Sequence, residues 1–76
     1  MHVGTIELGT KLRRRREVLG LLQTQLAALS GVSVRTIQHV EQGKGNPGLD
    51  TLLQLADPLG VRLDLVLKEP GKSGEE

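Results

Sequence analysis

The sequence has no cysteine, phenylalanine, tryptophan or tyrosine among its 76 residues, and only two histidines. Without cysteine it can form neither disulfides nor thiolate metal sites, and without aromatic residues it offers no stacking platform for nucleic-acid bases. His2 and His39 are too few and too far apart in the chain to form a metal cage. We therefore expect no metal and no other cofactor. The lack of a recognisable nucleophile or acid–base pair also argues against an enzyme.

Long apolar runs are missing as well. No run approaches the roughly 20 apolar residues of a membrane-spanning helix, and no signal peptide is visible. These absences predict a cytoplasmic protein that makes no contact with a membrane. The length predicts one small domain, and a chain of this size buries only about 60–65% of its unfolded surface. Support from a partner subunit is therefore plausible.

The small net charge of +1 conceals an uneven distribution. Residues 1–47 carry seven Lys and Arg against three Asp and Glu, a net charge of +4. Residues 48–76 carry three basic against six acidic residues, a net charge of −3. A basic half joined to an acidic half indicates one surface for a polyanion and another for a different partner. An ordinary mixed surface would have the same composition, so charge alone leaves both interpretations open.

Leucines at helical spacing predict a first helix that begins near Thr5, as N-cap, and ends at Gly20. A second helix fits residues 23–30 and would bury Leu26 and Leu29.

Ser33 is placed to cap a third helix over residues 34–42, with Ile37 and Val40 directed inward. The glycines and the proline within residues 43–48 predict a loop.

A fourth helix should start at Leu49 and bury one apolar face, formed by Leu49, Leu52, Leu53 and Ala56. Pro58 lacks a backbone donor, so we expect this helix to end or kink near Asp57.

After the fourth helix the apolar period changes to two, which is typical of a half-buried strand. The apolar positions are Val61, Leu63, Leu65 and Leu67. This strand has no companion in the chain, so we expect it to pair with the same strand of a second copy about a two-fold axis. The predicted organisation is a DNA-binding domain over residues 1–60, a dimerisation strand over 61–69 and a disordered tail over 70–76. The alternative is a helical or disordered C-terminus.

The spacing within the second and third helices identifies the class of function. Counting Gln23 as the first position, Ala27 is fifth, Gly31 ninth, Ile37 fifteenth and Val40 eighteenth. A small residue allows two helices to cross closely, glycine allows the sharp turn, and the two apolar residues anchor the second helix. This pattern indicates a helix-turn-helix with its second helix free to enter the major groove of DNA. A purely structural bundle of three helices is the competing interpretation.

The sequence resembles the phage repressor/Cro (Xre) helix-turn-helix family from about Leu8 to Val61. The residues that carry the resemblance are Leu8-Gly9-x-x-Leu12-Arg13-x-x-Arg16, Gly20-Leu21-x-Gln23-x-x-Leu26-Ala27, Gly31-Val32-Ser33-x-x-Thr36-Ile37 and Glu41-x-Gly43-Lys44-x-Asn46-Pro47. It implies a mostly α fold like that of lambda repressor, with four to five short helices plus the C-terminal β-strand. Two departures are Leu22, where the family usually has a capping Thr or Ser, and Pro58.

The resemblance implies that four side chains of the third helix face base edges: Val34, Arg35, Gln38 and His39. Arg can hold guanine, Gln can pair with adenine and Val can meet a thymine methyl group. Solvated positions on a surface helix are the alternative. The resemblance also implies phosphate contacts, by Gln23 and by Lys44 with the Gly43 amide. The hydroxyls of Ser33 and Thr36 either contact phosphate or only cap the helix.

Arg13 to Arg16 are consecutive and point in four directions from a helix, so they cannot all face DNA. The resemblance implies that Arg16 pairs with Glu41 and braces the first helix against the third. The other three arginines are expected to be solvated.

Together these features predict a homodimeric, sequence-specific repressor that binds double-stranded DNA through the major groove of a palindromic operator. Residues 60–67 are similar to the terminal strand of HipB-like antitoxins, which implies an autoregulating antitoxin with a HipA-like kinase toxin as partner. The alternative is a protein-interaction module that neutralises a toxin or another partner and has only incidental DNA affinity.

Overall fold

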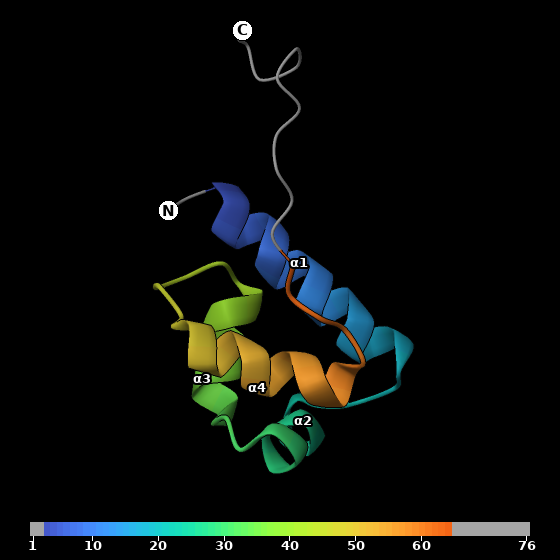
Figure 1. Ribbon diagram of the computed structural model, residues 1–76. Coiled ribbons are helices and arrows are strands. Elements are labelled where there is room, and N and C mark those ends of the chain that lie inside the picture. The colour runs from blue at the N-terminus through green and yellow to red at the C-terminus, as the bar shows by residue number, and fades with distance from the viewer. Residues whose placement is uncertain (1–2, 65–76) are drawn as a thin grey trace, which may run out of the picture.

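The computed structural model describes residues 3–64, which form four helices and no strand (Figure 1). The helices are α1 (Val3–Val18), α2 (Gln23–Ser30), α3 (Val34–Glu41) and α4 (Leu49–Leu59). The expected mostly α bundle is therefore confirmed over this part of the chain. No helix in it is both long enough and apolar enough to cross a membrane.

All four helices contribute to a single apolar core. Its fully buried members lie on α2, α3 and α4, and Leu12 adds a residue from α1. The core residues are Leu12, Leu26, Val32, Ile37, Val40, Leu55 and Leu59. Burying one such side chain contributes about 1.5–3 kcal/mol, and this packing gives three short helices most of their stability.

Glycines occupy the turns at the ends of three of the helices. Gly20, Gly31 and Gly60 adopt positive φ angles of 72°, 77° and 69° at the ends of α1, α2 and α4. The Gly31 N–H donates to the Ala27 carbonyl at 2.9 Å, which closes α2 as expected.

The expected start of the first helix was wrong. The helix α1 begins at Val3, two residues before Thr5, which lies within the first turn. This turn is held by tertiary packing, because the Gly43 backbone lies against Ile6. A side-chain cap is worth only about 1 kcal/mol, so packing decides where the helix begins.

The expected burial of Leu29 was also wrong, since Leu29 is 62% exposed. Only one stripe of α2 faces the core, and its members are three and four residues apart: Gln23, Leu26, Ala27 and Ser30. Leu29 lies outside this stripe, so the packing of so short a helix leaves it on the surface.

The buried face of α4 begins one turn later than expected. Leu49 and Leu53 are 63% and 49% exposed. The stripe that faces the core is Leu52, Leu55, Ala56 and Leu59. Both stripes have helical spacing in this leucine-rich segment, so periodicity cannot choose between them. The structure selects the stripe that contains two fully buried leucines.

The helix α4 ends at Leu59, two residues after Asp57, near which Pro58 was expected to end or kink it. Proline removes one donor in the last turn, while Leu59 is fully buried and holds the turn in place. The Gly60 N–H donates to the Asp57 carbonyl at 3.1 Å and the Val61 N–H donates to Ala56 at 3.1 Å, which completes the helix end.

The predicted dimerisation strand falls only partly within the structure. Val61 and Leu63 are half-buried in a segment, residues 61–64, without regular secondary structure. Leu65 and Leu67 lie outside the described residues, as does the predicted tail. A strand that pairs only with a second copy forms no ladder within one chain, so the strand stays a prediction.

Candidate nucleic-acid interface

The helices α2 and α3 form a tight-turned pair. Val32 in the turn is buried, and Ser33 caps α3 by accepting the Thr36 N–H on Oγ at 3.1 Å. The buried residues of α3 are Ile37 and Val40, so its opposite face is directed outward. This geometry is the helix-turn-helix predicted from the spacing.

The outward face of α3 carries three polar side chains, Arg35, Gln38 and His39, all on exposed residues. Their positions, three and four residues apart, place them on one side of the helix. Val34 is half-buried at the start of the same helix. An α-helix with such a face fits the major groove, where guanidinium and carboxamide groups can bind base edges. The four residues predicted to read bases are therefore brought together.

The hydroxyls of Ser33 and Thr36 bond to each other as well as to the backbone. Ser33 Oγ donates to Thr36 Oγ1 at 2.9 Å, in addition to accepting the Thr36 N–H. The structure therefore gives Ser33 a capping role. A phosphate contact by either residue stays a prediction.

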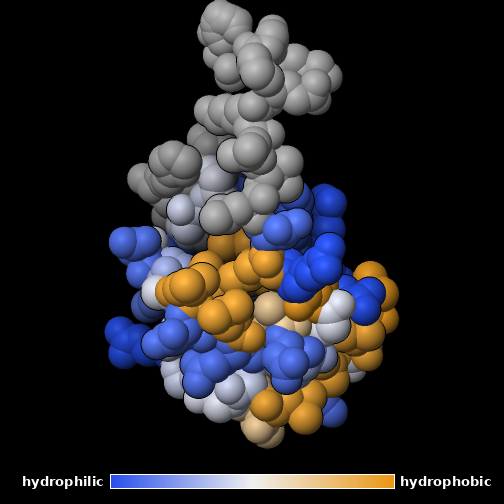
Figure 2. All heavy atoms as spheres, viewed as in Figure 1, coloured by the Kyte–Doolittle hydropathy of each residue, from blue (hydrophilic) through white to orange (hydrophobic). Residues whose placement is uncertain are grey.

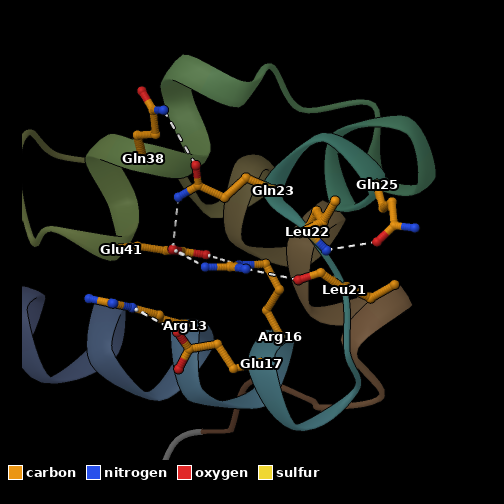
Figure 3. Close-up of polar contacts among 9 residues, drawn as sticks. All are labelled: Arg13, Arg16, Glu17, Leu21, Leu22, Gln23, Gln25, Gln38 and Glu41. Carbon is orange, nitrogen blue, oxygen red and sulfur yellow. Dashed lines mark hydrogen bonds and ion pairs between the residues drawn. The ribbon is translucent and has the colours of Figure 1, made fainter.

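A buried ion pair fastens the pair of helices to α1 (Figure 3). Arg16 Nε lies 2.6 Å from Glu41 Oε2, and Arg16 Nη2 donates to Glu41 Oε1 at 2.9 Å. Arg16 Nη1 also donates to the Leu21 carbonyl at 2.8 Å. The two side chains are only 10% and 6% exposed. A bidentate pair of this kind fixes both position and orientation, so α1 holds the C-terminal end of α3 in place.

The ion pair keeps both groups charged. The hydrogen bond to Glu41 raises the pKa of Arg16 above its usual value, against the opposing effect of burial. For Glu41, burial alone would raise the pKa. The hydrogen bonds from Arg16 and Gln23, together with the charge of Arg16, outweigh burial and lower it. Glu41 is therefore an ionised hydrogen-bond acceptor at neutral pH.

Gln23, predicted to contact phosphate, connects the ion pair to the outward face of α3 (Figure 3). Its Nε2 donates to Glu41 Oε1 at 3.1 Å, and its Oε1 accepts from Gln38 Nε2 at 3.3 Å. One side chain at the start of α2 thus links a buried carboxylate to a predicted base-reading residue.

The loop after α3 contains two residues predicted to contact phosphate, Gly43 and Lys44. The Gly43 N–H donates to the Val40 carbonyl at 3.0 Å, and the predicted use of this amide for phosphate stays a prediction. The tight turn at Gly43, where φ is 73°, requires that bond. The exposed Lys44 remains a candidate, and it lines a shallow surface hollow together with Thr36 and His39.

The four arginines of α1 have separate environments. Arg13 pairs with Glu17 at the surface, with Nε and Oε2 3.2 Å apart, and Arg14 is exposed. Arg15 is not simply solvated as expected, because its Nε donates to the Leu59 carbonyl at 2.7 Å. A cation at a helix C-terminus is favourable, so Arg15 caps α4.

Two further structural contacts have only weak signals in the sequence. A Cβ on Gly9 would collide with the Val40 carbonyl oxygen and lie 3.0 Å from that of Glu41, so glycine permits the close approach of α1 and α3. Leu22 has no side-chain cap to offer α2, as expected. Gln25 provides half of a capping box instead, because its Oε1 accepts the Leu22 N–H at 2.8 Å.

Within residues 3–64, no group of three or more His, Cys, Asp or Glu side chains could hold a metal ion.

Comparison with known proteins agrees with this geometry. A model of the helix-turn-helix family matches residues 12–66. An uncharacterized HTH-type transcriptional regulator of Haemophilus influenzae is 44% identical over 61 residues, which are 80% of this chain and 62% of the relative. The HTH-type transcriptional regulator PuuR of Escherichia coli is 36% identical over 67 residues, which are 88% of this chain and 36% of PuuR. The chain thus spans less than two thirds of both relatives.

A solved structure is similar to this chain in fold as well as in sequence. The restriction-modification controller protein C.AhdI of Aeromonas hydrophila superimposes with a TM-score of 0.76 at 34% identity, covering 80% of this chain and 92% of that protein. The family model, the relatives and the arrangement of α2 and α3 lead to the same assignment. The chain belongs to the Xre-like helix-turn-helix family of transcriptional regulators.

Proposed function

We propose that this chain is a sequence-specific repressor that places α3 in the major groove of double-stranded DNA. The observation that carries the proposal is the orientation of α3. Ile37 and Val40 are buried, the Glu41 end is tied to α1, and Arg35 and Gln38 face outward. A helix held rigidly on one side and polar on the other can present donors and acceptors to base edges. A protein bound in this way at a promoter excludes the transcription machinery.

The proposed contacts fall into two classes. Arg35, Gln38, His39 and Val34 would read bases. Gln23 and Lys44, with the hydroxyls of Ser33 and Thr36, would hold phosphates. Phosphate contacts position the protein without reading sequence, whereas each bidentate base contact discriminates by about 1–3 kcal/mol.

The proposal includes a homodimer on a palindromic operator. An apolar surface over α4 supports it (Figure 2). Leu49 and Leu53 are exposed on α4 and line one hollow with Leu63. A second copy that covers this surface would also bring together the two predicted strands over residues 61–69. Two recognition helices could then occupy half-sites about 34 Å apart.

Fluorescence anisotropy with labelled duplexes tests the proposal. We expect the full chain to prefer DNA from upstream of its own gene over scrambled duplex by about a thousandfold, also at higher salt. Arg35→Ala and Gln38→Ala should each cost about 1–3 kcal/mol on the native duplex only. Arg14→Ala removes one exposed charge outside the helix pair and should weaken binding to both duplexes equally. Equal binding of both duplexes that collapses with salt would contradict sequence reading.

If the chain is instead a protein-interaction module, the same variants should behave differently. Such a module would keep binding its partner protein after Arg35→Ala and Gln38→Ala, and would show no operator preference. The antitoxin role rests on residues 60–67, most of which lie outside the described residues, and stays a prediction. Capture of a HipA-like kinase by the full chain would support that role.

A further inference from the structure

We propose that Gln23 is a positioning residue that fixes the orientation of the Gln38 carboxamide and thereby makes Gln38 selective for adenine. This inference rests on the proposed function, because it requires that α3 reads bases. Its basis is a chain of hydrogen bonds that runs from the buried ion pair to the outward face of α3 (Figure 3).

The direction of each carboxamide follows from the acceptor at the buried end. Glu41 Oε1 takes part in the ion pair with Arg16 and carries no hydrogen at neutral pH. A carboxylate can only accept, so the group that Gln23 turns toward it at 3.1 Å must be its NH₂. The Gln23 carbonyl oxygen then points the other way, toward α3.

The same reasoning applies to the next side chain. Gln23 Oε1 has no hydrogen, so Gln38 must turn its own NH₂ toward it, at 3.3 Å. The Gln38 oxygen is consequently directed away from Gln23, as Figure 3 shows. In an unconstrained glutamine the carbonyl oxygen and the NH₂ group can exchange places by rotation about the last side-chain bond. In this chain one buried carboxylate removes that freedom.

The fixed orientation determines which base suits Gln38. Its oxygen can accept from the adenine N6 amino group, while its second N–H hydrogen can donate to adenine N7. Guanine presents only acceptors at these positions and would face the Gln38 oxygen with its own O6. A bidentate contact of this type discriminates against the wrong base by about 5- to 150-fold. The arrangement therefore predicts adenine opposite Gln38.

Selection from random duplexes followed by sequencing tests the inference without a known operator. The wild type should show one adenine preference in each half-site that Gln38→Met abolishes. Gln23→Met keeps the length of the side chain and removes its carboxamide. It should flatten the preference at that same position by about tenfold and leave the other positions unchanged. The double variant should show the same preferences as Gln38→Met.

Lys44→Met is the matched control, because it removes another proposed phosphate contact with the same replacement residue. It should lower affinity uniformly and keep the adenine preference. If Gln23→Met behaves like Lys44→Met, the positioning role is refuted while base reading stands. If the wild type selects no sequence at all, the proposed function itself fails. Circular dichroism melts establish that each variant is folded.

A measurement on the wild type does not depend on how the variants fold. In NMR spectra of the full chain, the Gln38 side-chain NH₂ protons should show nuclear Overhauser effects to the Gln23 side chain. Free rotation of the Gln38 carboxamide, without such contacts, would overturn the inference.

Discussion

Removing the charge of Glu41 should destabilise the whole domain. In Glu41→Gln the Arg16 guanidinium stays only 10% exposed but loses its counter-charge, keeping one bond to the Leu21 carbonyl. Breaking a buried pair from one side typically costs about 3–5 kcal/mol. Because the bond to Leu21 is retained, we expect a loss of about 3 kcal/mol. A chain of this length has roughly 4–11 kcal/mol of stability in total, so the loss is a large fraction of it.

Because the chain has no aromatic residue, far-ultraviolet circular dichroism should follow unfolding by urea and by heat. A loss of 3 kcal/mol corresponds to a Tm lower by about 12–24 °C for a domain of this size. Glu17→Gln is the control, because it breaks the surface pair with Arg13, whose two side chains are 60% and 52% exposed. That pair should contribute no more than about 0.5 kcal/mol.

A double replacement separates the buried charge from the lost contacts. Arg16→Met combined with Glu41→Leu leaves no unpaired charge in the interior, so it should recover part of the stability lost in Glu41→Gln. If Glu41→Gln costs no more than Glu17→Gln, the ion pair does not hold α1 to α3. If the double variant is less stable than the single one, uncompensated charge is not the cause of the loss.

Three further predictions concern stability. Folding lowers the pKa of Glu41, so ionised Glu41 contributes to the free energy of unfolding above the ordinary glutamate pKa of about 4.3. This contribution is lost as the pH falls through the folded pKa. The free energy of unfolding should therefore decrease less steeply on acidification in Glu41→Gln than in the wild type. Gly9→Ala should cost about 1–3 kcal/mol in urea melts, because its Cβ meets the backbone of α3. Gly48→Ala, whose Cβ meets open space, should lose only the preference for glycine over alanine at the N-cap of α4, less than about 1 kcal/mol. Leu22→Ser should raise the Tm by completing the capping box with Gln25, a gain of about 0.5–1 kcal/mol, and an unchanged Tm would argue against a missing cap.

Features that depend on neighbouring residues could be predicted from the sequence. Gly31 and Ser33 act within one turn of their own position, as a left-handed turn and a helix cap. The inward positions of Ile37 and Val40 follow from spacing in a helix that has only one apolar face. These local signals agree with the global fold, which is why the helix pair could be identified.

Features that depend on tertiary packing could not be predicted in this way. The leucines of α4 offer two stripes of equal spacing, and only contact with the other helices decides between them. Gln23 and Gln38 are 15 positions apart and their contact has no periodic signature. Arg16 and Glu41 are 25 positions apart, and only the resemblance to a family connected them in advance.

The hydrogen bonds at Glu41 link the stability of this domain to its proposed base specificity. Glu41 Oε1 accepts from both Arg16 and Gln23, so a change at Glu41 affects the brace between helices and the orientation of Gln38 together. Gln38 lies on the exposed face and can change with little effect on the core. We therefore expect new base preferences to be reached through Gln38 and Arg35. Changes at Arg16 or Glu41 should lower stability before any altered preference can be measured.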